Sequence, residues 1–88
     1  MRARLSTKIV EMSPSQCKAA RALLEWTQSE LARAADLGLS TIVDFEKQRR
    51  VVSGEALNAI RRALEQAGIE FLDGDGPGLR LHKPRSRR

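Results

Sequence analysis

Two helix-start signals in close succession are the feature that most constrains the fold. The segments 13–16 and 27–30 each place Ser or Thr three positions before Gln or Glu, and Pro14 follows the first of these hydroxyl residues. This spacing is typical of a capping box, in which two side chains satisfy free N–H groups at the start of a helix. The first helix must therefore end near Glu25 or Trp26, so the chain is predicted to fold as a series of short helices.

Apolar residues recur at helical spacing in four successive segments. These are Cys17, Ala20, Leu23 and Leu24, then Leu31, Ala34 and Ala35, then Ile42 and Phe45, and finally Leu57, Ile60, Leu64 and Ala67. The third helix is expected from about Leu39 or Ser40 to Lys47. Ser53 is predicted to cap the fourth helix and Gly68 to end it. The few residues between the second and third helices force these two helices to meet at a steep angle.

Two short strands are predicted after the fourth helix, because residues 69–72 and 79–81 flank the turn-forming sequence DGDGPG. A lone hairpin is marginal in water, so it must pack on the helices, on the N-terminal arm or on a second copy of the chain. The predicted organisation is an N-terminal arm or short strand over 1–12, a helical domain over 13–68, a strand or hairpin over 69–81 and a disordered basic tail over 82–88.

Length and composition restrict the class of protein. The 88 residues make one domain, and 41% hydrophobic with 31% charged residues is a soluble globular composition. No apolar run approaches the ~20 residues of a membrane helix, and the start lacks the apolar core of a secretory signal. A cytoplasmic protein without a membrane partner is expected.

One Cys and one His cannot form an internal disulfide or a structural zinc site. No catalytic or cofactor motif is present, so neither a cofactor nor enzyme activity is predicted.

The net charge of +5 comes from the two ends of the chain. The first eight residues contribute +3 and the last seven contribute +4, which leaves the body over 9–81 with −2. A basic protein suggests a polyanionic partner, but here that signal does not come from the domain itself. The argument for function therefore depends on the local pattern.

The second and third helices, joined by a tight turn, fit a helix-turn-helix module, because a helix of about 10–12 Å diameter fits a major groove about 12 Å wide. The segment 27–64 resembles the lambda-repressor-like, Cro-like regulators, also called the XRE family. The resemblance extends over about 13–67 and rests on Gln28, Leu31-Ala32, Ser40-Thr41-Ile42, Phe45-Glu46 and the stripe from Leu57 to Leu64. The sequence after Gly68 is similar to small bacterial members that end in a strand and a glycine-rich turn. The resemblance implies a mainly α fold: a compact four-helix domain with a short C-terminal β-hairpin or strand extension.

The chain departs from the family pattern in the turn and on the third helix. Asp36 stands where the family usually has Gly, and Gly38 where it has a capping Ser. Asp tolerates the left-handed conformation better than most residues, and Gly is an acceptable N-cap, so the turn is expected to survive. At the exposed start of the third helix, relatives often carry Gln, Arg or Asn, whereas this chain has Leu39 and Ser40.

The resemblance implies roles for residues at matching positions. Base contacts are expected from Leu39, Ser40, Val43 and Asp44, and phosphate contacts from Gln28, Thr41, Lys47, Arg49 and Arg50. Apolar side chains suit thymine methyl groups, and Asp44 could accept from a cytosine amino group. We expect Asp44→Ala to relax specificity more than it weakens binding. Gln28 is also expected to brace the third helix.

Several conspicuous residues are interpreted structurally. Cys17 is expected to be a small buried side chain. Trp26 is expected to pack between the first two helices. Glu46 is expected to pair with an arginine or cap a loop amide. Arg61-Arg62 and His82 are expected to face solvent.

The predicted function is a sequence-specific, double-stranded-DNA-binding transcription regulator, a repressor that acts as a homodimer on a palindromic operator. One such module contacts few bases, so two half-sites about one turn (~34 Å) apart are needed for specificity. The expected dimer contacts are Ile69, Phe71, Leu79 and Leu81. The alternative is an antitoxin-like protein-binding module, in which the hairpin or tail binds a protein partner and DNA binding is autoregulatory.

Overall fold

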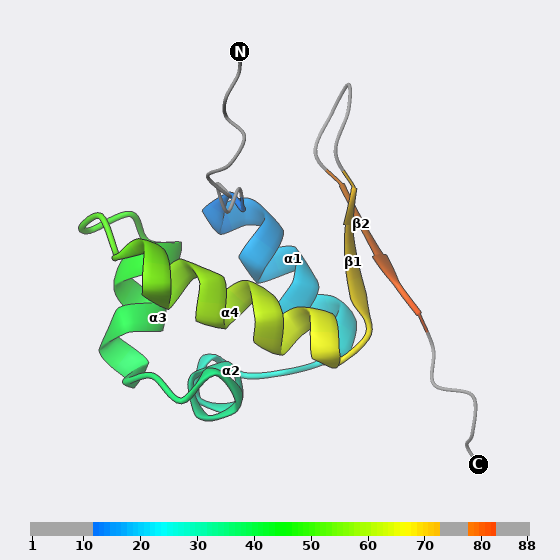
Figure 1. The fold of residues 1–88 in the computed structure, drawn as a ribbon, viewed down its shortest axis with the longest axis horizontal. Helices are drawn as coiled ribbons and strands as arrows, with labels where there is room; N and C mark the ends of the chain where they lie inside the picture. Colours follow the sequence, from blue (N-terminus) through cyan, green and yellow to red (C-terminus); the bar gives the residue numbers. More distant parts are fainter. Residues whose placement is uncertain (1–11, 73–77, 83–88) are drawn as a thin grey trace.

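Four helices followed by an antiparallel hairpin make up the part of the chain that the computed structural model describes, residues 12–72 and 78–82 (Figure 1). The elements are α1 (Pro14–Leu24), α2 (Gln28–Ala35), α3 (Leu39–Glu46), α4 (Gly54–Gln66), β1 (Ile69–Leu72) and β2 (Gly78–Leu81). The mainly α fold with a short C-terminal hairpin is thereby confirmed. Most of the predicted arm over 1–12, the turn over 73–77 and the tail beyond His82 lie outside the described residues.

The helix starts follow the predicted capping chemistry. Ser13 accepts the N–H of Gln16 at 3.0 Å, and the Gln16 side chain accepts the N–H of Ser13 at the same distance. Thr27 and Glu30 make the equivalent pair of bonds at the start of α2. The Ser53 hydroxyl caps α4, whereas α3 begins at Gly38 without a side-chain cap. Three of the four helix starts are therefore specified by residues within three positions of the cap.

The ends of α1, α2 and α3 share one construction. Each ends in a non-glycine residue in the left-handed conformation, with φ of 59° at Glu25, 60° at Asp36 and 57° at Gln48. The residue after each donates its N–H back to a carbonyl in the last turn, as in a Schellman motif. The bonds are Trp26 to Arg21 at 2.9 Å, Leu37 to Ala32 at 2.9 Å and Arg49 to Asp44 at 2.8 Å. The predicted left-handed turn at Asp36 is confirmed.

The core lies between the helices and is closed by the hairpin. Its largest fully buried side chains are Leu31, Ile42, Ile60, Leu64 and Cys17. On α1, Leu24 packs against this core while Leu23 is 46% exposed, so the prediction that both leucines face inward was wrong for Leu23. Adjacent residues on a helix lie about 100° apart, and the core takes only one of them.

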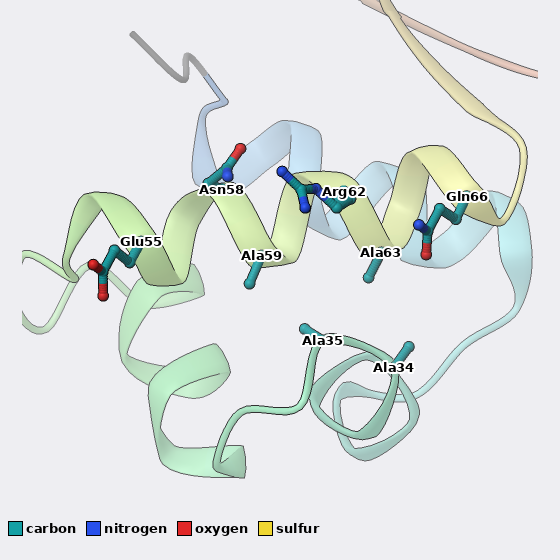
Figure 2. A pocket seen from close by; sticks show the side chains of 8 residues that line it. All are labelled: Ala34, Ala35, Glu55, Asn58, Ala59, Arg62, Ala63 and Gln66. Carbon is teal, nitrogen blue, oxygen red and sulfur yellow. The ribbon is translucent and has the colours of Figure 1, made fainter. Parts of the chain in front are cut away.

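Small side chains allow α2 and α4 to approach each other closely. Ala34 and Ala35 of α2 point toward Ala59 and Ala63 of α4 (Figure 2). A shallow hollow of about 200 Å³ remains between them, bordered by longer polar side chains of α4. The hollow follows from the size of the alanine side chains, and Ala34, expected on the inner face, is exposed at its edge.

The hairpin packs on the helices, which the instability of an isolated hairpin requires. β1 lies against α4 and β2 against α1, and Ile69 pairs with Leu81 while Phe71 pairs with Leu79 (Figure 1). Gly68 joins α4 to β1 with φ of 112°, and a Cβ there would lie 2.8 Å from the carbonyl oxygen of His82. The fold therefore needs glycine at this position, both for its φ and for the close approach of β2.

Across the described ranges, no helix is both long enough and apolar enough to cross a membrane.

Candidate nucleic-acid interface

Helix α3 presents one face to the core and another to the surface. Ile42 and Glu46 are buried, whereas Leu39 is 47% exposed and Ser40 is exposed. Val43 and Asp44 are half-buried. The four predicted base contacts therefore lie on the parts of α3 that the core leaves at least partly accessible.

A buried carboxylate at the end of α3 ties three helices together. The guanidinium of Arg21 on α1 donates to both oxygens of Glu46, from Nη2 to Oε1 at 2.7 Å and from Nε to Oε2 at 2.8 Å. Gln28 on α2 donates to Oε1 at 3.0 Å, and the Cys17 thiol donates to Oε2 at 3.0 Å. Because the Glu46 side chain is only 2% exposed, these four donors replace its water and fix α3 against α1 and α2.

The electrostatics of this cluster favour one protonation state for each member. Burial alone would raise the pKa of Glu46, but hydrogen bonds from Arg21, Cys17 and Gln28 outweigh it and hold the pKa below its usual value of 4.5. Burial is the largest cause that raises the pKa of the Cys17 thiol. The hydrogen bond to Glu46 and the negative charge of the Glu46 carboxylate raise it further. The cluster is therefore an ionised carboxylate held by neutral and cationic donors.

Sequence reasoning foresaw parts of this cluster. The pairing of Glu46 with an arginine, the buried position of Cys17 and the bracing of α3 by Gln28 are confirmed. Arg21 was missed because only the apolar residues of the first helix were expected to face the core. A signal was present, since Cys17 and Arg21 are four residues apart and so share one helix face.

A second, exposed cluster joins α3 to the turn that follows it. The Asp44 carboxylate accepts from Nε of Arg50 at 2.9 Å and lies 4.0 Å from Nη1 of Arg49. Nη2 of Arg50 lies 3.5 Å from the Thr41 hydroxyl. The structure thus brings together four of the predicted DNA contacts, while Lys47 is exposed at the end of the helix.

The predicted dimer contacts occupy two kinds of position. Ile69 and Phe71 are 3% and 7% exposed and belong to the core of the single chain. Leu79 and Leu81 are half-buried and pack against the same core. These side chains stabilise the protomer itself, which the sequence pattern did not distinguish from a surface for a second copy.

One of the residues that were expected to face solvent, Arg61, departs from that position. Arg61 lies 4.6 Å from the centroid of the Phe71 ring and pairs with Glu65 at 3.0 Å, with 21% of its side chain exposed. The expectation that Arg61 faces solvent was therefore wrong, whereas Arg62 is exposed as expected. His82 is exposed as expected, and its Nε2 lies 2.7 Å from the Glu70 carboxylate.

Comparison with known families bears directly on this arrangement of helices. A family model described as Helix-turn-helix matches residues 18–71, which is more than half of the chain. The chain belongs to the lambda-repressor-like, Cro-like helix-turn-helix family. No curated protein matches it. The matched region contains all of α2, α3 and α4, most of α1 and most of β1.

Membership assigns a general function to the surfaces described above. The helix-turn-helix chain is a DNA-binding transcription regulator of the XRE type. In such modules the second helix of the motif lies in the major groove while the first crosses the backbone. The helices at the corresponding positions of this chain are α3 and α2. Within residues 12–72 and 78–82, no three His, Cys, Asp or Glu side chains gather as a metal site.

Proposed function

We propose that this helix-turn-helix regulator is a sequence-specific repressor that binds a palindromic operator as a homodimer, with α3 in the major groove. The observation that carries the proposal is the contrast between the two faces of α3. One face is fixed by the buried Glu46 cluster, and the other leaves Leu39 and Ser40 exposed. A helix that reads base edges needs both a fixed orientation and accessible side chains.

The start of α3 reads bases chiefly through apolar contact. Leu39 is 47% exposed although it is a large hydrophobic residue. Such exposure is accounted for if Leu39 packs against thymine methyl groups, with Val43 beside it and the Ser40 hydroxyl able to bond to either base edge. The half-site is therefore expected to contain at least one A·T pair under the start of α3.

Phosphate contacts come from both ends of the motif. Lys47 and Arg49 are exposed after α3, and Thr41 and Gln28 are half-buried near the helix starts. Such contacts set the register of the protein on the duplex without reading sequence. They predict an affinity that falls as salt concentration rises.

The homodimer is proposed from the need for specificity, because one module of this size contacts too few bases. Ile69 and Phe71 are buried in the protomer, so the contact between copies is proposed at Leu79 and Leu81 and along the hairpin edges. Among residues 12–72 and 78–82 the sheet has two strands, β1 and β2, and the outer edge of each can accept a further strand. Light scattering after size exclusion should give the mass of a dimer on DNA; a strict monomer on the selected duplex would end this part of the proposal.

The deciding experiment is selection from a random duplex pool at two salt concentrations. We expect an enriched palindrome whose half-sites lie about one helical turn apart, bound less tightly at higher salt. Leu39→Ala should weaken binding to the selected duplex, and Leu23→Ala is its matched control, because Leu23 is a leucine on α1 with almost the same exposure, 46%. Retention without enrichment, or equal effects of the two substitutions, would overturn the proposal.

No observation on residues 12–72 or 78–82 favours the antitoxin-like alternative. That function would need an extended apolar surface to capture a protein partner. Two of the three apolar residues of β1, Ile69 and Phe71, already lie in the core. A repressor role, rather than activation, is tested by transcription from a promoter that carries the selected operator.

A further inference from the structure

The negative charge on the surface of α3 is the feature that the proposed function does not yet explain. Asp44 lies on the helix that is proposed to enter the groove, where a carboxylate would be repelled by the phosphates. Its side chain is 22% exposed, and its nearest charged partners are Arg50 at 2.9 Å and Arg49 at 4.0 Å. The three side chains together carry +1, so the pairing replaces a repulsive group with a weakly attractive cluster.

The backbone after α3 places Arg50 beside Asp44. Gln48 adopts a φ of 57°, and the N–H of Arg49 donates to the Asp44 carbonyl at 2.8 Å. These bonds reverse the chain at the end of α3, so that Arg50 returns along the helix toward Asp44 and Thr41. The position of Arg50 therefore depends on the fold of the turn as well as on the side-chain contact.

The way in which Asp44 holds Arg50 leaves the outer end of the guanidinium available. Asp44 accepts from Nε, and Thr41 lies at the long distance of 3.5 Å from Nη2. Arginine has five N–H donors in a planar fork. The Nη groups can then meet the N7 and O6 acceptors of guanine, the commonest specific arginine contact in the major groove.

We propose that Asp44 is a positioning residue that orients Arg50 toward a guanine, and that it acts on DNA recognition through Arg50 instead of contacting a base itself. The inference rests on the proposed function, because it requires α3 to lie in the major groove. It replaces two of the roles expected from family resemblance, a base contact for Asp44 and a phosphate contact for Arg50. It makes Arg50 the residue that reads the base.

A double-mutant cycle separates this mechanism from direct readout by Asp44. Wild type, Asp44→Ala, Arg50→Ala and the double variant are titrated on the selected duplex and on duplexes with each G·C pair replaced in turn. A bidentate arginine–guanine contact should give wild type a preference of about 5- to 150-fold at one G·C pair. Both single variants should lose preference at that same pair, and the double variant should lose no more than Arg50→Ala alone.

Two conservative variants supply readouts that a merely structural role would not change. Arg50→Lys keeps the charge without the planar fork, so it should lose the preference while leaving the slope of log affinity against log salt nearly unchanged. Asp44→Asn keeps an acceptor for Nε, so it should retain more of the preference than Asp44→Ala. In free protein, the Arg50 Nε–H resonance should be protected from solvent exchange in wild type and not in Asp44→Ala.

The matched control is Glu65→Ala. Glu65 accepts from Arg61 Nε at 3.0 Å, close to the 2.9 Å of the Asp44 pair, but it lies in the last turn of α4. That end of α4 is the one away from α3 (Figure 1). Its removal should leave base preference unchanged.

The possible outcomes are distinct. If Asp44→Ala and Arg50→Ala lose preference at different pairs, or if their effects add, the inference is overturned while the proposed function stands. A uniform loss across all duplexes for Arg50→Ala, with a salt slope smaller by about 1, would make Arg50 a phosphate contact and also overturn the inference. If wild type selects no duplex, the proposed function fails and the inference fails with it.

Discussion

Helix α3 carries two carboxylates, two positions apart, that both pair with arginine in opposite environments. Glu46 is 2% exposed and receives hydrogen bonds from α1 and α2, whereas Asp44 is 22% exposed and is held by the turn that follows its own helix. The first pair joins parts of the chain that are far apart in sequence. The second joins neighbours at the surface. The same chemistry therefore fixes the helix on one side and is available to shape DNA recognition on the other.

Burial decides what each pair contributes to stability. Removing one partner of a buried ion pair leaves an uncompensated charge, which costs about 3–5 kcal/mol. An exposed pair contributes about 0–1 kcal/mol, because water and salt screen it. Variants of the two clusters should thus separate stability from recognition.

Replacement of Glu46 is expected to have the largest effect on the free energy of unfolding. Glu46→Ala leaves the Arg21 guanidinium, whose side chain is 19% exposed, without its carboxylate, and we expect a loss of about 3–5 kcal/mol in the free energy of unfolding. Urea titration followed by circular dichroism measures this loss. Asp44→Ala is the comparison on the same helix and should cost less than about 1 kcal/mol. Similar losses for the two variants would remove the distinction between the clusters.

A pH titration sharpens the same contrast. The pKa of Glu46 lies below its usual value of 4.5 in the folded chain, so its stabilisation is fully present above that value and is lost as pH falls through the folded pKa. The difference in unfolding free energy between wild type and Glu46→Gln should therefore shrink as pH falls from 6 to 3. A difference that stays constant over this range would contradict the lowered pKa.

Cys17 tests the neutral donor of the buried cluster. Cys17→Ala removes the thiol that donates to Glu46 and should cost about 1–2 kcal/mol. Because the folded chain raises the thiol pKa above its usual 9.0, the thiol contributes stability below pH 9 that is lost as pH rises further. The advantage of wild type over Cys17→Ala should accordingly diminish between pH 8 and 10.5 in the same urea titration, and an advantage that grew would contradict this account.

The smallest expected effect concerns the turn that brings Arg50 to Asp44. Gln48 holds a φ of 57°, which costs a non-glycine residue about 1–2 kcal/mol, so Gln48→Gly should stabilise the chain by about 0.5–1 kcal/mol after its greater freedom in the unfolded state is counted. Thermal unfolding measures the gain. Lys47→Gly is the control, because its φ of −95° suits any residue and glycine there should only destabilise. Equal shifts for the two variants would show that the conformation of Gln48 is not strained.

The features that were predicted correctly from the sequence depend mostly on residues close together in the chain. The capping boxes at Ser13 and Thr27, the left-handed Asp36 and the end of α4 at Gly68 depend on residues within a few positions, so spacing identifies them. The hairpin was also predicted, because its turn sequence and flanking apolar residues are contiguous.

The misses involve contacts that the local sequence pattern does not specify. Arg21 and Glu46 are 25 residues apart in the sequence, and neither local sequence indicates that the two side chains pair. The alternation of side chains in β1 placed Ile69 and Phe71 on one face of the strand. It did not show whether that face packs on α4 of the same chain or on a second copy. The pairing of Asp44 with Arg50 likewise depends on the reversal at Gln48, which spacing alone does not give.

The contact between α1 and β2 has a consequence for synthesis on the ribosome. The side chain of Gln16 donates to the carbonyl of Gly78 at 3.4 Å, so the first helix is completed by a strand made 62 residues later. At roughly 5–20 residues per second, the interval is about 3–12 s. Throughout that time the inner side of α1 has no strand to cover it. The nascent chain therefore emerges with α3 already translated and its core still open, and only arrival of the hairpin completes the fold.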